Sequence, residues 1–152
     1  MEQYKYIKLK FLIGGMDIQF DDNDLFENDD MTVINLSKAD TTTWLNIDPY
    51  KISIYNISTL KKAIKLGYNV NKQNKNGVTL LHCYARKNPS KSVMNSVKLL
   101  LEHGANPLIL THKQISVVDI AMKYNQPMAK LLITKYHVPA INAYKQILKI
   151  TS

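Results

Sequence analysis

The sequence predicts an all-α protein in which short helical hairpins stack side by side as a solenoid. Apolar residues recur every three or four positions in several segments, the period of a helix with one buried face. Glycine or asparagine follows these segments, as is common where helices end. Similar segments also return at a fixed spacing, and a hairpin of two short helices buries its apolar face only against copies of itself.

The repeat is visible as like residues standing 37 positions apart. The pairs are Gly67 and Gly104, Leu60 and Val97, Thr79 and Ser116, Leu81 and Val118, and Asn88 and Asn125. Agreement of several positions at one spacing is much rarer by chance than any single match. The spacing therefore predicts repeated structural units.

Residues 1–36 form an N-terminal segment outside the repeat. Residues 1–15 alternate lysine with apolar side chains, as a strand does, and Met16 offers a second translation start. Residues 17–30 are rich in aspartate and predict an acidic, partly flexible arm with a few aromatic anchors. A calcium loop is disfavoured because the mid-loop glycine and the closing glutamate are missing.

The repeat domain is expected at residues 37–152 and begins with a degenerate unit at 37–73. A step of 37 back from Thr79 reaches Thr42, which predicts a worn helix start there. Pro49 and the β-branched run after it argue against a clean helix pair. From residue 57 onward the helical pattern is clearer.

The central unit, residues 74–110, has the clearest pattern. Asn74 to Gly77 is turn chemistry, and Thr79 can cap a first helix. Asn88 and the proline after it end that helix, and a second helix runs to Gly104.

The third unit, residues 111–139, keeps the apolar pattern and changes key positions. Gln114 replaces the turn glycine, and Asp119 replaces the histidine of the central unit. Tyr136 stands where the central unit has its terminal glycine, which predicts a distorted left-handed cap. Residues 140–150 have the stripe of a closing helix.

Two segments of the central unit, residues 77–82 and 97–107, closely resemble the ankyrin repeat. That family's unit of about 33 residues is a β-turn and two antiparallel helices. Roughly four extra residues around Ser90 to Met94 would explain the longer spacing. This insertion and the run Leu-His-Cys-Tyr at 81–84 resemble the divergent repeats of poxvirus proteins, in a short form without their C-terminal F-box-like segment.

The resemblance implies structural roles for the signature residues. The signature histidine and threonine would bond the backbone around the turn and tie one repeat to the next. The residues assigned to the structure of the repeat are Gly67, Gly77, Thr79, Leu81, His82 and Gly104.

The resemblance also implies a concave protein-binding surface, lined by the turn tips and the first helices. In this chain it would comprise Asn74, Lys75, Asn76, Val78, Arg86 and Lys87 in the central unit and Thr111, His112, Lys113, Ile115, Lys123 and Tyr124 in the third. Five of these are lysine or arginine, so we expect a partner with an acidic surface.

The net charge of +8 is divided unevenly. Residues 1–30 hold three lysines and eight acidic residues, whereas residues 50–152 hold sixteen lysines and arginines and two acidic residues. Three explanations stay open: a surface for an acidic partner, an acidic arm folded on its own basic body, or an AT-rich genome that merely enriches a solvated face in lysine.

No pattern predicts a catalytic, metal or cofactor site. Cys83 and His82 would point about 100° apart on a helix and lack a third group to orient them. His103, His112 and His137 do not have the spacing of metal ligands. Glycine-rich nucleotide loops and serine elbows are missing as well. We therefore expect no enzyme, and no small-molecule substrate.

We expect instead a protein–protein interaction module, and the poxvirus resemblance implies a viral protein that binds a host protein to modulate host defence or host range. The alternative is a nucleic-acid-binding protein that uses the basic surface of residues 50–152, although no known motif for this is present. No apolar run reaches the ~18 residues of a membrane span. The expected location is the cytoplasm, with the nucleus as the alternative.

Overall fold

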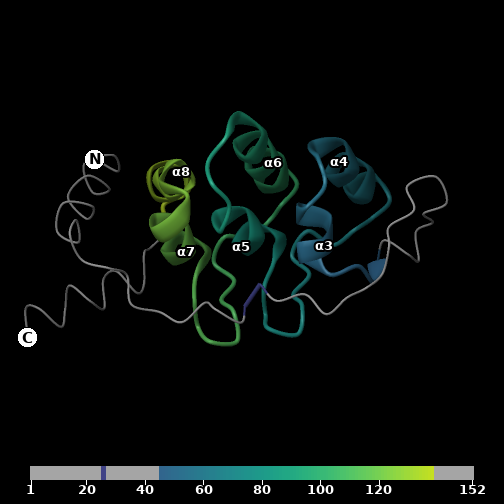
Figure 1. Ribbon diagram of the computed structural model, residues 1–152, viewed down its shortest axis with the longest axis horizontal. Coiled ribbons are helices and arrows are strands. Elements are labelled where there is room, and N and C mark those ends of the chain that lie inside the picture. Colours follow the sequence, from purple (N-terminus) through teal and green to yellow (C-terminus); the bar gives the residue numbers. More distant parts are fainter. Residues whose placement is uncertain (1–24, 27–44, 139–152) are drawn as a thin grey trace, which may run out of the picture.

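The computed structural model describes residues 25–26 and 45–138, and within them the chain is helical without strands. The helices are α3 (Pro49–Ser53), α4 (Ile57–Lys65), α5 (Leu80–Ala85), α6 (Lys91–Glu102), α7 (Val117–Tyr124) and α8 (Gln126–Tyr136). Within residues 45–138, consecutive helices pair as three hairpins that stand side by side (Figure 1). The predicted all-α row of stacked hairpins is confirmed.

The helices lie in two layers. The first helices of the hairpins, α3, α5 and α7, are neighbours in that order, and α4, α6 and α8 form the second layer (Figure 1). Helix α5 contacts α3 on one side, α7 on the other, and its own partner α6. The segments that precede α5 and α7 extend as two long loops on the same side of the molecule (Figure 1).

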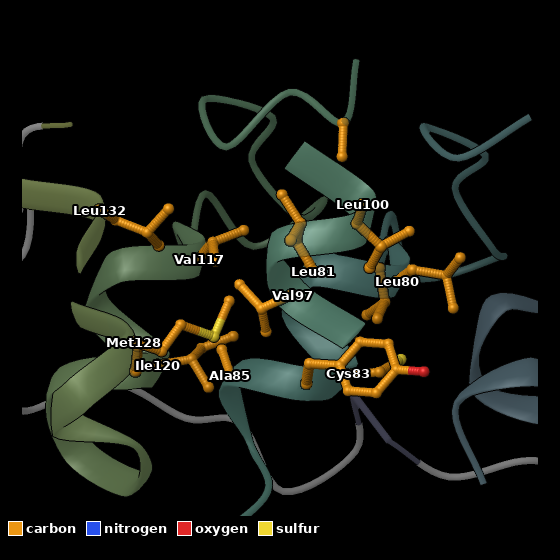
Figure 2. Packing of buried hydrophobic residues seen from close by; sticks show 14 of the residues in the cluster. Leu80, Leu81, Cys83, Ala85, Val97, Leu100, Val117, Ile120, Met128 and Leu132 are labelled. Atoms are coloured by element: carbon orange, nitrogen blue, oxygen red, sulfur yellow. The ribbon is translucent and has the colours of Figure 1, made fainter. Parts of the chain in front are cut away.

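The core runs continuously through the row of hairpins. All six residues of α5 are buried, and Figure 2 shows Leu81 of α5 and Val97 of α6 among apolar side chains of the next hairpin, such as Ile120. Each fully buried leucine or isoleucine contributes about 1.5–3 kcal/mol relative to exposure. A hairpin separated from its neighbours would lose most of this term, which is why the units stack.

Polar side chains fix where most of the helices begin. A side-chain oxygen of the N-cap residue accepts a backbone N–H from the first turn of the helix. The residues that do so are Asp48 for α3, Asn56 for α4, Ser90 for α6, Ser116 for α7 and Asn125 for α8.

The first hairpin within the described residues begins with α3. Its cap, Asp48, lies 31 residues before Thr79, whereas the spacing pointed to Thr42, which is outside the described residues. The expectation that Pro49 opposes a helix was wrong. Proline suits the first turn, where its missing N–H would have no partner, and Ile52 in the β-branched run is fully buried.

The extra residues between the helices of the central unit also lie earlier than predicted. Helix α5 ends at Ala85 and α6 begins at Lys91, so residues 86–90 form the link, whereas Asn125 alone links α7 and α8. The stretch from Ser90 to Met94 is the cap and first turn of α6. Asn88, expected to end the first helix, lies within this link and does not have a positive φ.

The predicted distortion at the end of the third unit is wrong. Tyr136 is the last residue of α8, and His137 after it takes the left-handed cap with φ of 56°. Gly67 and Gly104 do the same after α4 and α6, with φ of 94° and 86°. The closing helix expected at residues 140–150 lies outside the described residues.

Candidate functional site

The two long loops that carry most of the predicted surface residues are built in the same way. In the first, Asn74 Oδ1 accepts the backbone N–H groups of Asn76 at 2.9 Å and Val78 at 3.0 Å. In the second, Thr111 Oγ1 accepts the N–H of Ile115 at 3.1 Å. Thr111 stands 37 residues after Asn74, so the sequence repeat is also a repeat of loop geometry.

The backbones of these loops also meet directly. The N–H of His112 donates to the carbonyl of Asn76 at 3.0 Å. A Cβ atom at Gly77 would lie 2.6 Å from the His112 nitrogen, and Gly77 has a φ of 81°. Glycine is therefore required at this position both for the left-handed backbone and for the close approach of the second loop.

His82 connects the start of α5 to the loop before α7. Its Nδ1 accepts the backbone N–H of Thr79 at 3.1 Å, and its Nε2 lies 3.3 Å from the carbonyl of Ile115. Because Nδ1 accepts, Nε2 carries the hydrogen and donates to that carbonyl. Burial lowers the pKa of His82 to about 4. The ring is thus a neutral structural bridge between two repeats.

In the third unit a different pair of residues caps the N-terminus of the first helix, α7. The Ser116 hydroxyl donates to Asp119 Oδ2 at 2.7 Å, and the Asp119 N–H donates to Ser116 Oγ at 3.0 Å. Both residues are buried. Asp119 therefore takes the capping role that His82 has in α5.

Two asparagines tie neighbouring units together, and neither was among the predicted site residues. Asn71 donates to the carbonyl of Gly104 at 3.1 Å and accepts the N–H of Asn106 at 2.7 Å. Asn125 caps α8 and donates to the carbonyl of Tyr84 at 3.3 Å. The sequence matched Asn125 with Asn88 at the repeat spacing, but the cap of α6 in the central unit is Ser90, so the match did not indicate this role.

Three of the twelve predicted surface residues are buried, and this corrects the expected binding surface. Val78 and Ile115 pack into the core directly before α5 and α7, and Thr111 is 1% exposed with its hydroxyl bonded inside its own loop. Asn74 is half-buried and uses its side chain in the same way. The side chains of Val78, Thr111 and Ile115 therefore face the interior, and Asn74 keeps part of its surface exposed.

The other eight residues are exposed or half-buried, and we call them the loop face. They are Lys75, Asn76, Arg86, Lys87, His112, Lys113, Lys123 and Tyr124. Residues 75–76 and 112–113 lie at the tips of the two loops. Residues 86–87 and 123–124 lie at the C-terminal ends of α5 and α7.

Arg86 links the ends of α5 and α7 on the loop face. Its guanidinium carbon lies 4.0 Å from the centroid of the Tyr124 ring, within the range of a cation–π contact. The Nζ of Lys123 lies 5.1 Å from the centroid of the same ring. The sequence identified these residues as surface positions but gave no sign that they contact one another.

Two residues of the N-terminal segment lie on this face. Leu25 is 1% exposed, and its carbonyl accepts from the Asn76 side chain at 3.5 Å. The Phe26 ring centroid lies 5.8 Å from the guanidinium carbon of Arg86. Figure 1 shows the pair beside the two long loops, below α5. The sequence predicted aromatic anchors in the acidic arm, but not where they attach.

The described residues do not form a reactive thiol site or a metal site. Cys83 is buried, and burial raises the pKa of its thiol to about 12, so the thiol stays protonated near neutral pH. Residues 25–26 and 45–138 contain no group of three or more His, Cys, Asp or Glu side chains able to hold a metal ion. No helix in these ranges is both long and apolar enough to cross a membrane.

Comparison with known proteins identifies one similarity. A family model described as "Ankyrin repeats (3 copies)" matches residues 51–143. Neither a curated protein nor a solved structure matches the chain. Of the matched residues, 51–138 are described by the structure, and they include α4 to α8 and most of α3.

Proposed function

This chain belongs to the ankyrin-repeat family, and on that premise we propose that its loop face binds a protein with an acidic surface. Ankyrin repeats generally mediate protein–protein interaction and are typically not enzymes. The observation that carries the proposal is the composition of the loop face. Five of its eight residues are lysine or arginine. Lys75 and Lys113 lie in the two loops that share a backbone hydrogen bond, and Arg86, Lys87 and Lys123 lie at the C-terminal ends of α5 and α7.

The positive charge of the loop face favours partners with an acidic surface. An acidic surface approaching the loop face is attracted before contact, which raises the association rate and disfavours basic competitors. At physiological ionic strength the attraction between exposed charges decays over about 8 Å. Binding should therefore weaken as salt is added.

We also propose a biological setting. The five-residue link at 86–90 and the run at 81–84 support a viral protein, of the poxvirus type, that binds a host protein in the cytoplasm and modulates host defence or host range. The link follows α5 directly and begins with Arg86 and Lys87 of the loop face. The nucleus is the alternative location.

Affinity capture from host-cell extract tests the proposal. The bait is the wild-type chain, compared with the triple variant Arg86→Glu, Lys87→Glu and Lys123→Glu. The matched control reverses the charge of three exposed lysines on the other helix layer, Lys61, Lys98 and Lys130. A captured protein that is lost with the first variant and kept with the control supports the proposal. If every captured protein survives the first variant, the loop face is not the binding surface.

Nucleic acid is the competing partner for a basic face, and a salt titration with random-sequence DNA separates the two. Weak binding that disappears at physiological salt leaves the protein-binding proposal in place. Tight binding with a steep salt dependence would replace it, because counterion release dominates binding to phosphates.

A further inference from the structure

The loop face already holds a short segment of its own chain. Leu25 is buried within the apolar cluster of the repeats, although it precedes α3, the first of the helices named above, in the sequence. Its carbonyl accepts from Asn76, a loop-tip residue. Phe26 lies against Arg86, whose guanidinium also contacts Tyr124. An aliphatic side chain, a backbone acceptor and an aromatic ring are thus each met by a different group of the repeats.

The chemistry of this segment complements the face on which it lies. Leu25 and Phe26 are flanked in sequence by Asp21, Asp22, Asp24, Glu27, Asp29 and Asp30. The loop face is rich in lysine and arginine, and the aromatic ring of Phe26 adds a cation–π contact to Arg86. The apolar pair supplies attachment, and the charge around it supplies attraction over a longer range.

We propose that the loop face recognises short acidic segments that carry adjacent aliphatic and aromatic side chains, and that Leu25–Phe26 occupies this site as a competitor built into the chain. The inference rests on the proposed function and names the chemistry of its ligand. A partner segment of this type must displace Leu25–Phe26 to bind.

The tether determines how strong this competition is. A segment attached to the same chain acts at an effective concentration on the order of millimolar. A free segment with the same contacts binds only the fraction of molecules whose site is open, so its apparent affinity is reduced by that fraction. Removing the two side chains should therefore make the site accessible to a free segment.

A labelled peptide with the sequence of residues 17–30 tests this directly by fluorescence anisotropy. It is titrated into the full-length wild-type chain and into the full-length variant Leu25→Ser with Phe26→Ser. We expect the variant to bind the peptide at least about tenfold more tightly than the wild type, because the tethered competitor is lost. The affinity should fall as salt is added.

Two controls give the result its meaning. A peptide carrying the same two serine substitutions should not bind the variant chain, which shows that the apolar pair is recognised and not charge alone. Adding Arg86→Gln to the variant should weaken binding of the unchanged peptide several-fold. Because Leu25 is buried, circular dichroism first establishes that the variant is folded. If it is not, Phe26→Ser alone, which changes a partly buried residue, replaces it in the same titration.

The remaining outcomes overturn the inference. Equal peptide affinity for the wild type and the variant means that Leu25–Phe26 does not compete, and no binding to a folded variant means that the face does not recognise this chemistry. Neither outcome removes the proposed function, which fails only if captured proteins are indifferent to charge reversal on the loop face.

Discussion

One position in each of the two long loops has a left-handed backbone, which favours glycine. Gly77 and Gln114 stand 37 residues apart in equivalent turns, with φ of 81° and 64°. Glycine has no steric penalty there, whereas a residue with a Cβ pays about 1–2 kcal/mol. Gln114 therefore destabilises the turn of the third unit, and the rest of the structure holds this turn in place.

The change Gln114→Gly should stabilise the protein by up to about 1 kcal/mol, since part of the relief is offset by the greater freedom of glycine in the unfolded chain. Urea unfolding followed by circular dichroism measures the difference. The control Gln114→Ala removes the same side chain atoms beyond Cβ but keeps the strain, so it should bring no gain. A gain of equal size in both variants would show that the side chain, and not the backbone, was unfavourable.

His82 makes stability depend on pH, and the sign follows from its lowered pKa. The pKa is about 4 in the folded protein and 6.5 when unperturbed. Above pH 6.5 the ring is neutral in both states, and its contribution is complete. Between pH 6.5 and 4 only the unfolded chain gains the proton, so stability falls as the pH falls, by a total on the order of 3 kcal/mol.

The measurement is the free energy of unfolding from pH 7.5 to 4 for the wild type and His82→Gln. The variant should be less stable at neutral pH, because it loses the bridge from Thr79 to Ile115, and its stability should fall less steeply between pH 6.5 and 4. Parallel curves for the two proteins would contradict the role of this ring, since the variant retains the other three histidines.

At the scale of the elements, the helices were easier to predict from sequence than the links between them. The apolar period located α4 to α8, because burial of one face requires that spacing. It missed α3, where Pro49 was taken as a breaker although it stands in the first turn. The resemblance to a unit of about 33 residues placed the extra residues at Ser90 to Met94, because a serine that caps a helix and a serine in a loop look alike in sequence. The hydrogen bond from the Val93 N–H to Ser90 shows that Ser90 is a cap.

The candidate site was predictable only in part, because the position of a residue in a repeat does not show how deeply it is buried or what it contacts. Position along a repeat identified Arg86 and Tyr124 as surface residues, since the repeat fixes which side of a unit each position faces. It could not show that Val78 and Ile115 are buried, because both lie in extended segments whose depth is set by the neighbouring unit. The attachment of Leu25–Phe26 to the loop face is a contact across about 50 residues of sequence, which no local pattern encodes.

The N-cap residues of α6 and α8 differ, because only that of α8 also bonds to the neighbouring hairpin. Asn125 caps α8 and also donates to the carbonyl of Tyr84 in the preceding hairpin. Ser90 caps α6 through Val93 at an exposed position. The change Asn125→Ala should cost about 2 kcal/mol, because a cap and one hydrogen bond are lost while the Tyr84 carbonyl keeps the N–H of Lys87, whereas Ser90→Ala should cost only about 1 kcal/mol. Thermal unfolding of the two variants compares them, and equal losses would mean that the bond to Tyr84 contributes nothing.

At the scale of the whole molecule, the question is whether the hairpins behave as separate units or as one. A stacked array derives its stability from each unit and from the interfaces between neighbours. Here His82 and Asn125 both bridge the central and third units, Asn71 bridges the first and central units, and α5 is buried between α3 and α7. The central hairpin thus contributes to both interfaces, and the outer hairpins to one each among the described residues.

A cavity in the central hairpin should therefore weaken the outer hairpins as well. Leu81 is 1% exposed, and Leu81→Ala should cost about 3 kcal/mol through lost burial and the cavity left behind. Native-state hydrogen exchange should show reduced protection of amides in α3 and α7 as well as in α5 and α6, because those helices lose the support of α5. A loss of protection confined to α5 and α6 would mean that each hairpin is stable without its neighbours, against the coupling that the shared core and the inter-repeat bonds imply.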